Sequence, residues 1–269
     1  LKPESGSSTE IGYKKAFKSK NGDWKGFFDA AIFVMDYKDM TEFQFGLHGP
    51  NDLGDSIDFL EFVLNLEYLG FKANNVSRAR IAGWDVSSFA EGKIGMFPIR
   101  FWGGYTYSYP GDLSDDPSQK KAGQYIKNMF NAFALKADDP LVNSILNFRA
   151  LHVARLDVEM DYKGLSLGTS LNYNGYMYNV DDFFKGEGDV AEWGVLVSQE
   201  LAGIVESVTE FRKNRTKGDL VWNLRASYLF KKKHQVDVGI NNVLNRQYAV
   251  RPLKMNAPMT FNVRYSKEF

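Results

Sequence analysis

One segment of the sequence carries a charged residue at every second position. In "HVARLDVEMDY" the odd positions hold Arg155, Asp157, Glu159 and Asp161, and the even positions from 154 to 162 hold apolar or aromatic residues. Side chains of a β-strand alternate between its two faces, so this spacing places the four charges on one face. Guanidinium and carboxylate groups in such an arrangement form charge-assisted hydrogen bonds. The pattern predicts a polar pairing surface.

Two more charges occupy the polar side of similar segments. Arg225 lies in "LVWNLRASYLF", and Arg264 lies in "TFNVRYSKEF", which ends the sequence. In both segments the alternate positions are mostly apolar, as expected for strands with one apolar face and one polar face. We take these six charged residues as the candidate functional side chains.

The sequence offers few residues that could catalyse a reaction or bind a metal. The chain has no cysteine, and His48, His152 and His234 lie too far apart to form a ligand pair at helix or strand spacing. The acidic segments "DLSDDP" and "NVDDFF" lack EF-hand spacing, so solvated loops are favoured over calcium sites. No phosphate cradle, nucleophile elbow or catalytic carboxylate pair is found. We therefore expect no enzyme, no metal site and no cofactor.

The net charge argues against a nucleic-acid partner, because 33 basic residues balance 33 acidic residues. No stretch of about 18 consecutive apolar residues predicts a membrane-spanning helix. The first residues, "LKPESGSSTE", have neither the basic nor the apolar region of a signal peptide. Two interpretations stay open at this point: a cytoplasmic protein, or a piece whose targeting signal lay further upstream.

The alternation recurs along the chain and predicts nine strands. Their approximate ranges are 9–18, 26–37, 77–90, 94–109, 149–163, 165–179, 218–231, 234–242 and 259–269. Short links, including 18–25, 90–93, 163–165 and 231–234, take turns with long links at about 37–76, 110–148, 180–217 and 243–258. An antiparallel outer-membrane barrel has this layout, with short periplasmic turns and long extracellular loops. Such barrels usually close with an even number of strands, so nine strands predict a part of a larger barrel.

A soluble β-sandwich is the alternative, because its strands also alternate with one buried face. Aromatic residues make 15% of the chain, and many fall near the ends of the predicted strands on the apolar side. Such a distribution is typical of the aromatic girdles of membrane barrels. The tyrosines in question are Tyr105, Tyr107, Tyr109, Tyr162, Tyr173, Tyr228 and Tyr265. We favour the membrane barrel.

Seven segments and the end of the chain carry a family resemblance. They are, in chain order, "LKPE", "EIGYK", "DAAIFVMDYKDM", "GWDVS", "GYTYSYP", "GDLVWNLRASYLF" and "VGINNVLNRQYAVRP", followed by a terminal aromatic residue. Their sequences and order resemble the C-terminal half of TonB-dependent outer-membrane receptors. The resemblance spans nearly the whole chain. It implies an all-β transmembrane barrel in the outer membrane of a Gram-negative bacterium, with residues 1–269 supplying the last nine of about 22 strands and long, partly helical extracellular loops.

The resemblance also implies a function and partners. Receptors of this family import a scarce, large nutrient such as a siderophore, haem, cobalamin or a glycan. The energy comes from the TonB complex through a plug domain in the lumen. We expect the plug, its TonB-contacting segment (the TonB box) and the early strands to be missing from this chain, and to be supplied by an upstream segment or a separate chain. A passive porin-like channel and a receptor-like scaffold of an outer-membrane complex remain as alternatives.

Within this interpretation the six charged residues face the lumen. They are Arg155, Asp157, Glu159, Asp161, Arg225 and Arg264, and plug contact through remakeable hydrogen bonds is favoured over simple solvation of a polar interior. No ligand-binding residue is assigned.

The long loops contain apolar residues at helical spacing in segments 56–70, 119–145 and 192–208. A small satellite core is favoured over a lid or a surface for a partner lipoprotein. Outer-membrane lipid is the remaining partner that we expect, because it covers the apolar strand faces.

The terminal alternation of Phe269, Tyr265 and Val263 resembles the signal by which outer-membrane proteins are recognised for insertion. Replacing Phe269 by a polar residue, or deleting it, is expected to lower the amount of protein in the outer membrane without lowering its synthesis. Immunoblots of outer-membrane fractions and of whole cells measure the two quantities. Unchanged insertion of the variant would refute the role of this residue.

Overall fold

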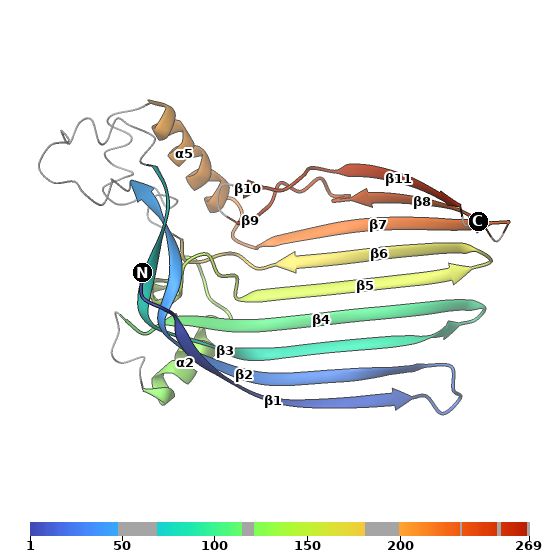
Figure 1. The fold of residues 1–269 in the computed structure, drawn as a ribbon, viewed down its shortest axis with the longest axis horizontal. Helices are drawn as coiled ribbons and strands as arrows, with labels where there is room; N and C mark the ends of the chain where they lie inside the picture. Colours follow the sequence, from blue (N-terminus) through green and yellow to red (C-terminus); the bar gives the residue numbers. More distant parts are fainter. Residues whose placement is uncertain (48–68, 115–120, 181–198, 232, 252–253, 268–269) are drawn as a thin grey trace, which may run out of the picture.

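Nine strands form one antiparallel sheet in the computed structural model, which describes residues 1–47, 69–114, 121–180, 199–231, 233–251 and 254–267. The order in the sheet is β1-β2-β3-β4-β5-β6-β7-β8-β11, so strands that follow one another in the chain pair, except that β9 and β10 lie between β8 and β11 (Figure 1). β1 and β11 form the two edges, and the sheet is open between them. The predicted class and the predicted number of strands in the main sheet are confirmed.

The sheet strands are long and differ in length. Their bounds are β1 (Ser5–Lys18), β2 (Lys25–Leu47), β3 (Leu69–Ile94), β4 (Phe97–Asp112), β5 (His152–Tyr162), β6 (Leu165–Asn174), β7 (Asp219–Phe230), β8 (His234–Asn241) and β11 (Thr260–Lys267). The remaining elements are helix α2 (Ala122–Ala132), the 3₁₀ helix η3 (Pro140–Ser144), helix α5 (Gln199–Lys213) and the small hairpin of β9 (Ala249–Arg251) and β10 (Lys254–Met255). Among these helices none is long and apolar enough to cross a membrane.

All tight turns lie at one end of the strands and all long connections at the other, as predicted. In Figure 1 the turns are on the right, where the C-terminus also lies, and the long connections and the N-terminus are on the left. Positive φ angles at Lys163, Gly164 and Lys231 allow two of the turns to close within a few residues.

One predicted turn and the length of one predicted link were wrong. The segment 90–93, "AEGK", was predicted to be a turn, but β3 continues through it to Ile94, and the chain reverses at Gly95 with φ of 62°. Gly92 serves packing instead: a Cβ there would come within 2.3 Å of the Trp24 ring. The predicted link 37–76 is also shorter than expected, because β2 and β3 continue into it.

One face of the sheet is apolar and largely exposed. The register carries a row of residues on this face across four strands, from Ile11 to Ile32, Trp84 and Tyr107. Ile32 is 60% exposed, and Val263 on β11 is 73% exposed. So many apolar side chains would destabilise the protein if they faced water, so another phase or molecule must cover them. The other face carries the polar and charged members of each strand.

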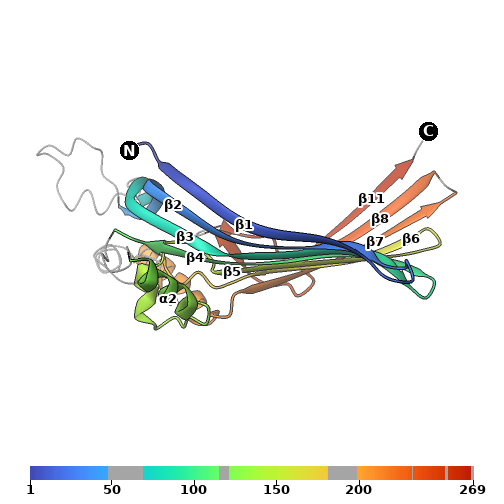
Figure 2. The same ribbon diagram turned by 90° about the horizontal axis from the view of Figure 1, so that it is seen from below.

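The loops after β4 form a small core of their own on the apolar face of the sheet. Buried Tyr107 and Tyr109 on β4 pack with Tyr125 and Ala132 of α2, and with Val142, Ile145 and Leu151 beyond the helix. In Figure 2 the ends of β1 and β11 curve toward one side of the sheet, and α2 lies on the opposite, convex side. We call this group the loop core.

The loop core confirms the predicted satellite packing for segment 119–145 over its described residues, 121–145, and corrects two other assignments. Tyr107 and Tyr109 were predicted as members of an exposed aromatic girdle, but both are 0% exposed beneath the loop core. Most of segment 56–70 lies outside the described residues, and segment 192–208 is described only from residue 199, where α5 begins.

A charge on the apolar face tests which phase covers it. Leu224 lies on this face of β7, opposite Ile240 of β8. Leu224→Arg is expected to lower the free energy of unfolding by about 2–4 kcal/mol if the side chain lies near the bilayer midplane. Denaturant unfolding of protein refolded in lipid vesicles measures the change. The control Asn262→Arg, at an exposed position on the polar face of β11 opposite Gly239, is expected to be tolerated. Equal, small losses for both variants would mean that water covers both faces.

Candidate functional site

Four of the six predicted charges lie together on the polar face of the sheet. Asp157, Glu159 and Asp161 follow one another on β5, and Arg225 reaches them from β7 across the intervening strand β6. Arg100 of β4 joins them from the other side. We call these five residues the charge cluster.

Arg225 binds two carboxylates at once. Its Nη1 and Nη2 donate to the two carboxylate oxygens of Asp157 at 2.9 and 2.7 Å. Nη2 also donates to Oε2 of Glu159 at 2.9 Å. The planar guanidinium matches a carboxylate in this bidentate geometry, which fixes its orientation as well as its position.

Arg100 completes the cluster on the far side of β5. Its Nη2 donates to Oε1 of Glu159 and lies 2.9 Å from Oδ2 of Asp161. Ser166 donates its hydroxyl to the other oxygen of Asp161 at 2.6 Å. Glu159 therefore lies between two guanidinium groups, which explains why one strand can hold three carboxylates at successive positions on one face.

Glycine at position 168 makes this geometry possible. The register places Gly168 of β6 between Glu159 of β5 and Arg225 of β7. A Cβ at Gly168 would lie 2.4 Å from Nε and 2.5 Å from Cζ of Arg225. The arginine side chain thus lies flat across the glycine to reach β5, and a side chain at position 168 would displace it.

The charge cluster continues a row of alternating charges along the same register. Lys25 of β2 pairs with Glu91 of β3 at 2.7 Å, and Glu91 is the register partner of Arg100. Opposite charges directly across neighbouring strands stabilise a sheet, whereas like charges destabilise it. The row reads Lys25, Glu91, Arg100, Glu159, Gly168 and Arg225, one residue from each of six neighbouring strands.

The other two predicted residues lie apart from the cluster. Arg155 is exposed on the same face of β5, where it lines a shallow depression with Trp102, Ser170 and Asn172. Arg264 is exposed on β11 opposite Asp237 of β8, four strands away from β5. The structure therefore groups four of the six predicted residues.

Sequence reasoning missed Arg100, Trp102 and Gly168. The signal for the first two was present, because the tyrosines at 105, 107 and 109 were assigned to the apolar face, and the same alternation puts even positions of this strand on the polar face. No sequence pattern marks Gly168, since its role depends on its pairing with Arg225 of the neighbouring strand β7 in the folded sheet.

The predicted insertion signal is described only in part. Val263 and Tyr265 lie on the apolar face of β11 opposite Val238 and Val236, and the Tyr265 hydroxyl lies 2.7 Å from Nδ1 of His234. Phe269 lies outside the described residues.

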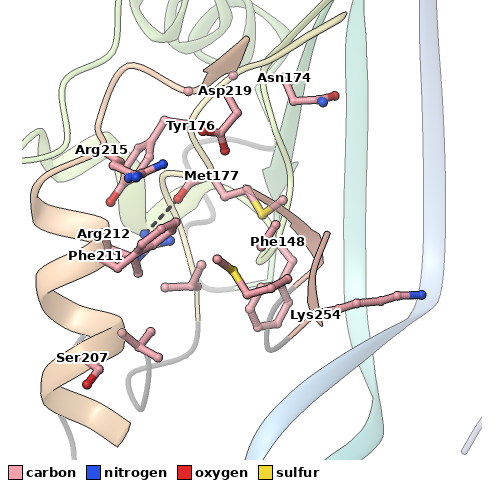
Figure 3. Close-up of a pocket in the computed structure, with 16 residues that line it drawn as sticks. Phe148, Asn174, Tyr176, Met177, Ser207, Phe211, Arg212, Arg215, Asp219 and Lys254 are labelled. Carbon is pink, nitrogen blue, oxygen red and sulfur yellow. Dashed lines mark hydrogen bonds between the residues drawn. The ribbon is translucent and has the colours of Figure 1, made fainter. Parts of the chain in front are cut away.

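A second candidate feature is a cavity of about 390 Å³ at the loop end (Figure 3). α5 forms one wall with Phe211 and Arg212, and Arg215 follows just after the helix. The segment after β6 contributes Tyr176 and Met177. The β9–β10 hairpin adds Lys254 and Met255, and Phe148 joins from the loop before β5. We call this space the loop-end cavity.

Two arginines give the loop-end cavity a positive character. Arg212 donates to the Met177 carbonyl at 2.9 Å, drawn as a dashed line in Figure 3, and its Cζ lies 4.9 Å from the centre of the Tyr176 ring. Burial lowers the pKa of Arg212 from its ordinary value, and Tyr176 acts in the opposite direction. Arg215 lies over the Phe211 ring at 4.7 Å. The acidic lining residue Asp219 is already paired with Arg246 at 3.1 Å.

Comparison with known proteins identifies the fold and the family. The family model described as "TonB dependent receptor-like, beta-barrel" matches residues 1–243. No curated protein matches the sequence at a significant level.

Solved structures of similar fold include three receptors. The ferric-catecholate import receptor Fiu from E. coli K12 has 17% identity and a TM-score of 0.54, with 100% of this chain and 28% of that chain covered. P. aeruginosa FpvA bound to a heterologous pyoverdine has 14% identity and a TM-score of 0.53, with 100% and 28% covered. The copper transporter OprC has 12% identity and a TM-score of 0.53, with 98% and 31% covered.

This chain thus spans less than a third of the length of these three structures. The family match covers most of the sequence, and the open antiparallel sheet with an apolar face agrees with it. Members of the family are outer-membrane proteins of Gram-negative bacteria. The chain belongs to the family of TonB-dependent receptor-like β-barrels.

Proposed function

We propose that residues 1–269 form the C-terminal part of the barrel of an outer-membrane importer that takes up a scarce, large nutrient with energy from the TonB complex. A plug domain and the earlier strands, from an upstream segment or another chain, complete this importer. The open edges of the sheet at β1 and β11 support the need for further strands, because unpaired backbone groups are not tolerated in hydrocarbon.

The charge cluster is the observation that carries the proposal. Its arginines are 42–48% exposed and its carboxylates 26–37% exposed, so the groups are oriented by one another and still accessible from the lumen. Charge-assisted hydrogen bonds of this kind can be shared with an incoming surface and remade when it moves. A plug that contacts the cluster would be held by polar contacts rather than by a buried apolar interface. Such contacts can break and form again when the plug moves during transport.

The loop-end cavity is the part of the ligand site that we assign to this chain. Its lining combines aromatic and thioether surfaces with the guanidinium groups of Arg212 and Arg215. Such a surface suits an anionic ligand with an apolar or aromatic body. Among the four nutrient classes, this favours haem or a ferric siderophore over a neutral glycan.

Weakening the charge cluster is expected to loosen the plug. In the complete receptor, Arg225→Gln removes the bidentate contact, and Gly168→Val keeps every charge but displaces the Arg225 side chain. Both variants are expected to raise the ionic conductance of single receptors in planar bilayers.

The matched control for that experiment is Arg80→Gln. Arg80 makes a similar two-point contact with Asp36, at 2.8 and 3.1 Å, but on the apolar side of the sheet. Each of these pairs is partly exposed and contributes about 0.2–1 kcal/mol to stability, so all three variants are expected to fold. Conductance that stays at the wild-type level in both cluster variants would refute plug contact. A wild-type receptor that is already open would favour the passive channel.

Uptake tests the ligand class and the energy source together. Cells that express the complete receptor are expected to take up haem or a ferric catecholate, and a protonophore is expected to abolish this uptake. Arg212→Gln is expected to reduce uptake several-fold at equal amounts of receptor in the outer membrane. Lys213→Gln is the control, because Lys213 lies on the same helix but does not line the loop-end cavity. Uptake that persists with the protonophore would refute active transport.

A further inference from the structure

Helix α2 belongs to the long connection after β4, and it packs against the apolar face of the sheet. The hydroxyl of Tyr107 on β4 donates to the Met129 carbonyl of α2. The Tyr125 hydroxyl lies 2.7 and 2.8 Å from the carbonyl oxygens of Tyr109 and Arg80. These contacts attach the helix to the outer wall of the barrel, on the convex side seen in Figure 2.

The helix lies at the height where the hydrocarbon ends. On β4 the apolar face runs from Phe97, beside the turn, to Tyr107, beside α2. These ten residue steps at about 3.3 Å, in a strand tilted by about 40°, rise about 25 Å, which is the height of the apolar band of such barrels. At the turn end, Phe97 and Tyr162 pack at 5.1 Å and mark the other boundary. α2 therefore lies at the extracellular boundary of the band.

The surface of α2 has three sides. One side is buried against the sheet and carries Tyr125, Asn128 and Ala132. A second side exposes Ile126, with 50% of the residue exposed, and Phe130, with 61% exposed. A third side carries Lys127 and Asn131, which are also exposed. Phe133, directly after the helix, extends the apolar side.

The exposed apolar side is continuous with the lipid-facing wall. The ring of Phe133 lies 5.4 Å from Trp84, and Phe130 lies 6.4 Å from Trp84. Trp84 belongs to the same apolar row as Ile32 and Ile11. Charge agrees with this position: residues 121–136 contain three lysines and no acidic residue, which suits an anionic headgroup layer.

We propose that α2 and Phe133 form an interfacial anchor in the outer leaflet. Ile126, Phe130 and Phe133 insert between acyl chains, and Lys121, Lys127 and Lys136 lie at the level of anionic headgroups. The anchor fixes the height and rotation of this part of the barrel wall in the membrane. It rests on the family assignment and is independent of the ligand and of transport.

Collision measurements on spin labels test the anchor, since the described chain offers no competing cysteine. Phe130→Cys and Asn131→Cys place a nitroxide on adjacent residues of opposite character, and Ile32→Cys provides a lipid-facing reference on β2. The complete receptor, with any cysteine elsewhere replaced, is reconstituted in vesicles of phosphatidylethanolamine and phosphatidylglycerol. The ratio of collisions with oxygen to collisions with a water-soluble nickel chelate is measured for each label.

The label at position 130 is expected to match the reference at position 32, with a ratio several-fold above that at position 131. Equal, high nickel collisions at 130 and 131 would overturn the proposal, because the helix would then stand in water. Low collisions with both reagents at 130 would overturn it in favour of a protein partner. Heat-modifiable migration in gels shows that each variant is folded, and Ile126→Cys repeats the measurement if Phe130→Cys fails to fold.

Discussion

Every feature of this chain depends on backbone pairing between strands whose two faces meet different solvents. In hydrocarbon an unpaired N–H or C=O group costs several kcal/mol, so the strands must run side by side without interruption. The antiparallel ladder from β1 to β11 satisfies this demand for each inner strand. Once the strands are paired in a given register, the alternation of side chains decides which of the two sheet faces each residue lies on.

Strand pairing also explains how charged residues can lie close together without destabilising the fold. A row perpendicular to the strands brings together residues that are far apart in sequence, such as Lys25, Arg100 and Arg225. Because neighbouring strands contribute opposite charges, the row is neutralised locally and stays hydrated on the lumen side. The wall therefore presents oriented polar groups to whatever fills the lumen, while the apolar face opposite them is unaffected.

The fold class, the number of strands in the main sheet and the separation of short turns from long loops could be predicted from the sequence, because period-two alternation and loop lengths are local signals. Gly92 misled the prediction of a turn: a glycine in "AEGK" is as compatible with close packing against Trp24 as with chain reversal. Tyr107 and Tyr109 have the spacing of girdle residues, and only the folded loop shows that α2 covers them.

The charge cluster was predictable in outline but not in its membership. Asp157, Glu159 and Asp161 share a strand, so their common face follows from spacing alone. The participation of Arg225 depends on the register of three strands and on the absence of a side chain at Gly168. The loop-end cavity left no local signal, since its walls come from α5, the chain after β6 and the β9–β10 hairpin.

Among the described residues the edges of the sheet are unequal, with 14 residues in β1 and 8 in β11. A strand that joined β11 would find a shorter template than one that joined β1, so the two seams of the completed cylinder would form with different numbers of hydrogen bonds. The seam at β11 would then contribute fewer hydrogen bonds to the closed wall than the seam at β1. The short seam is also where the finished wall would open first under lateral strain.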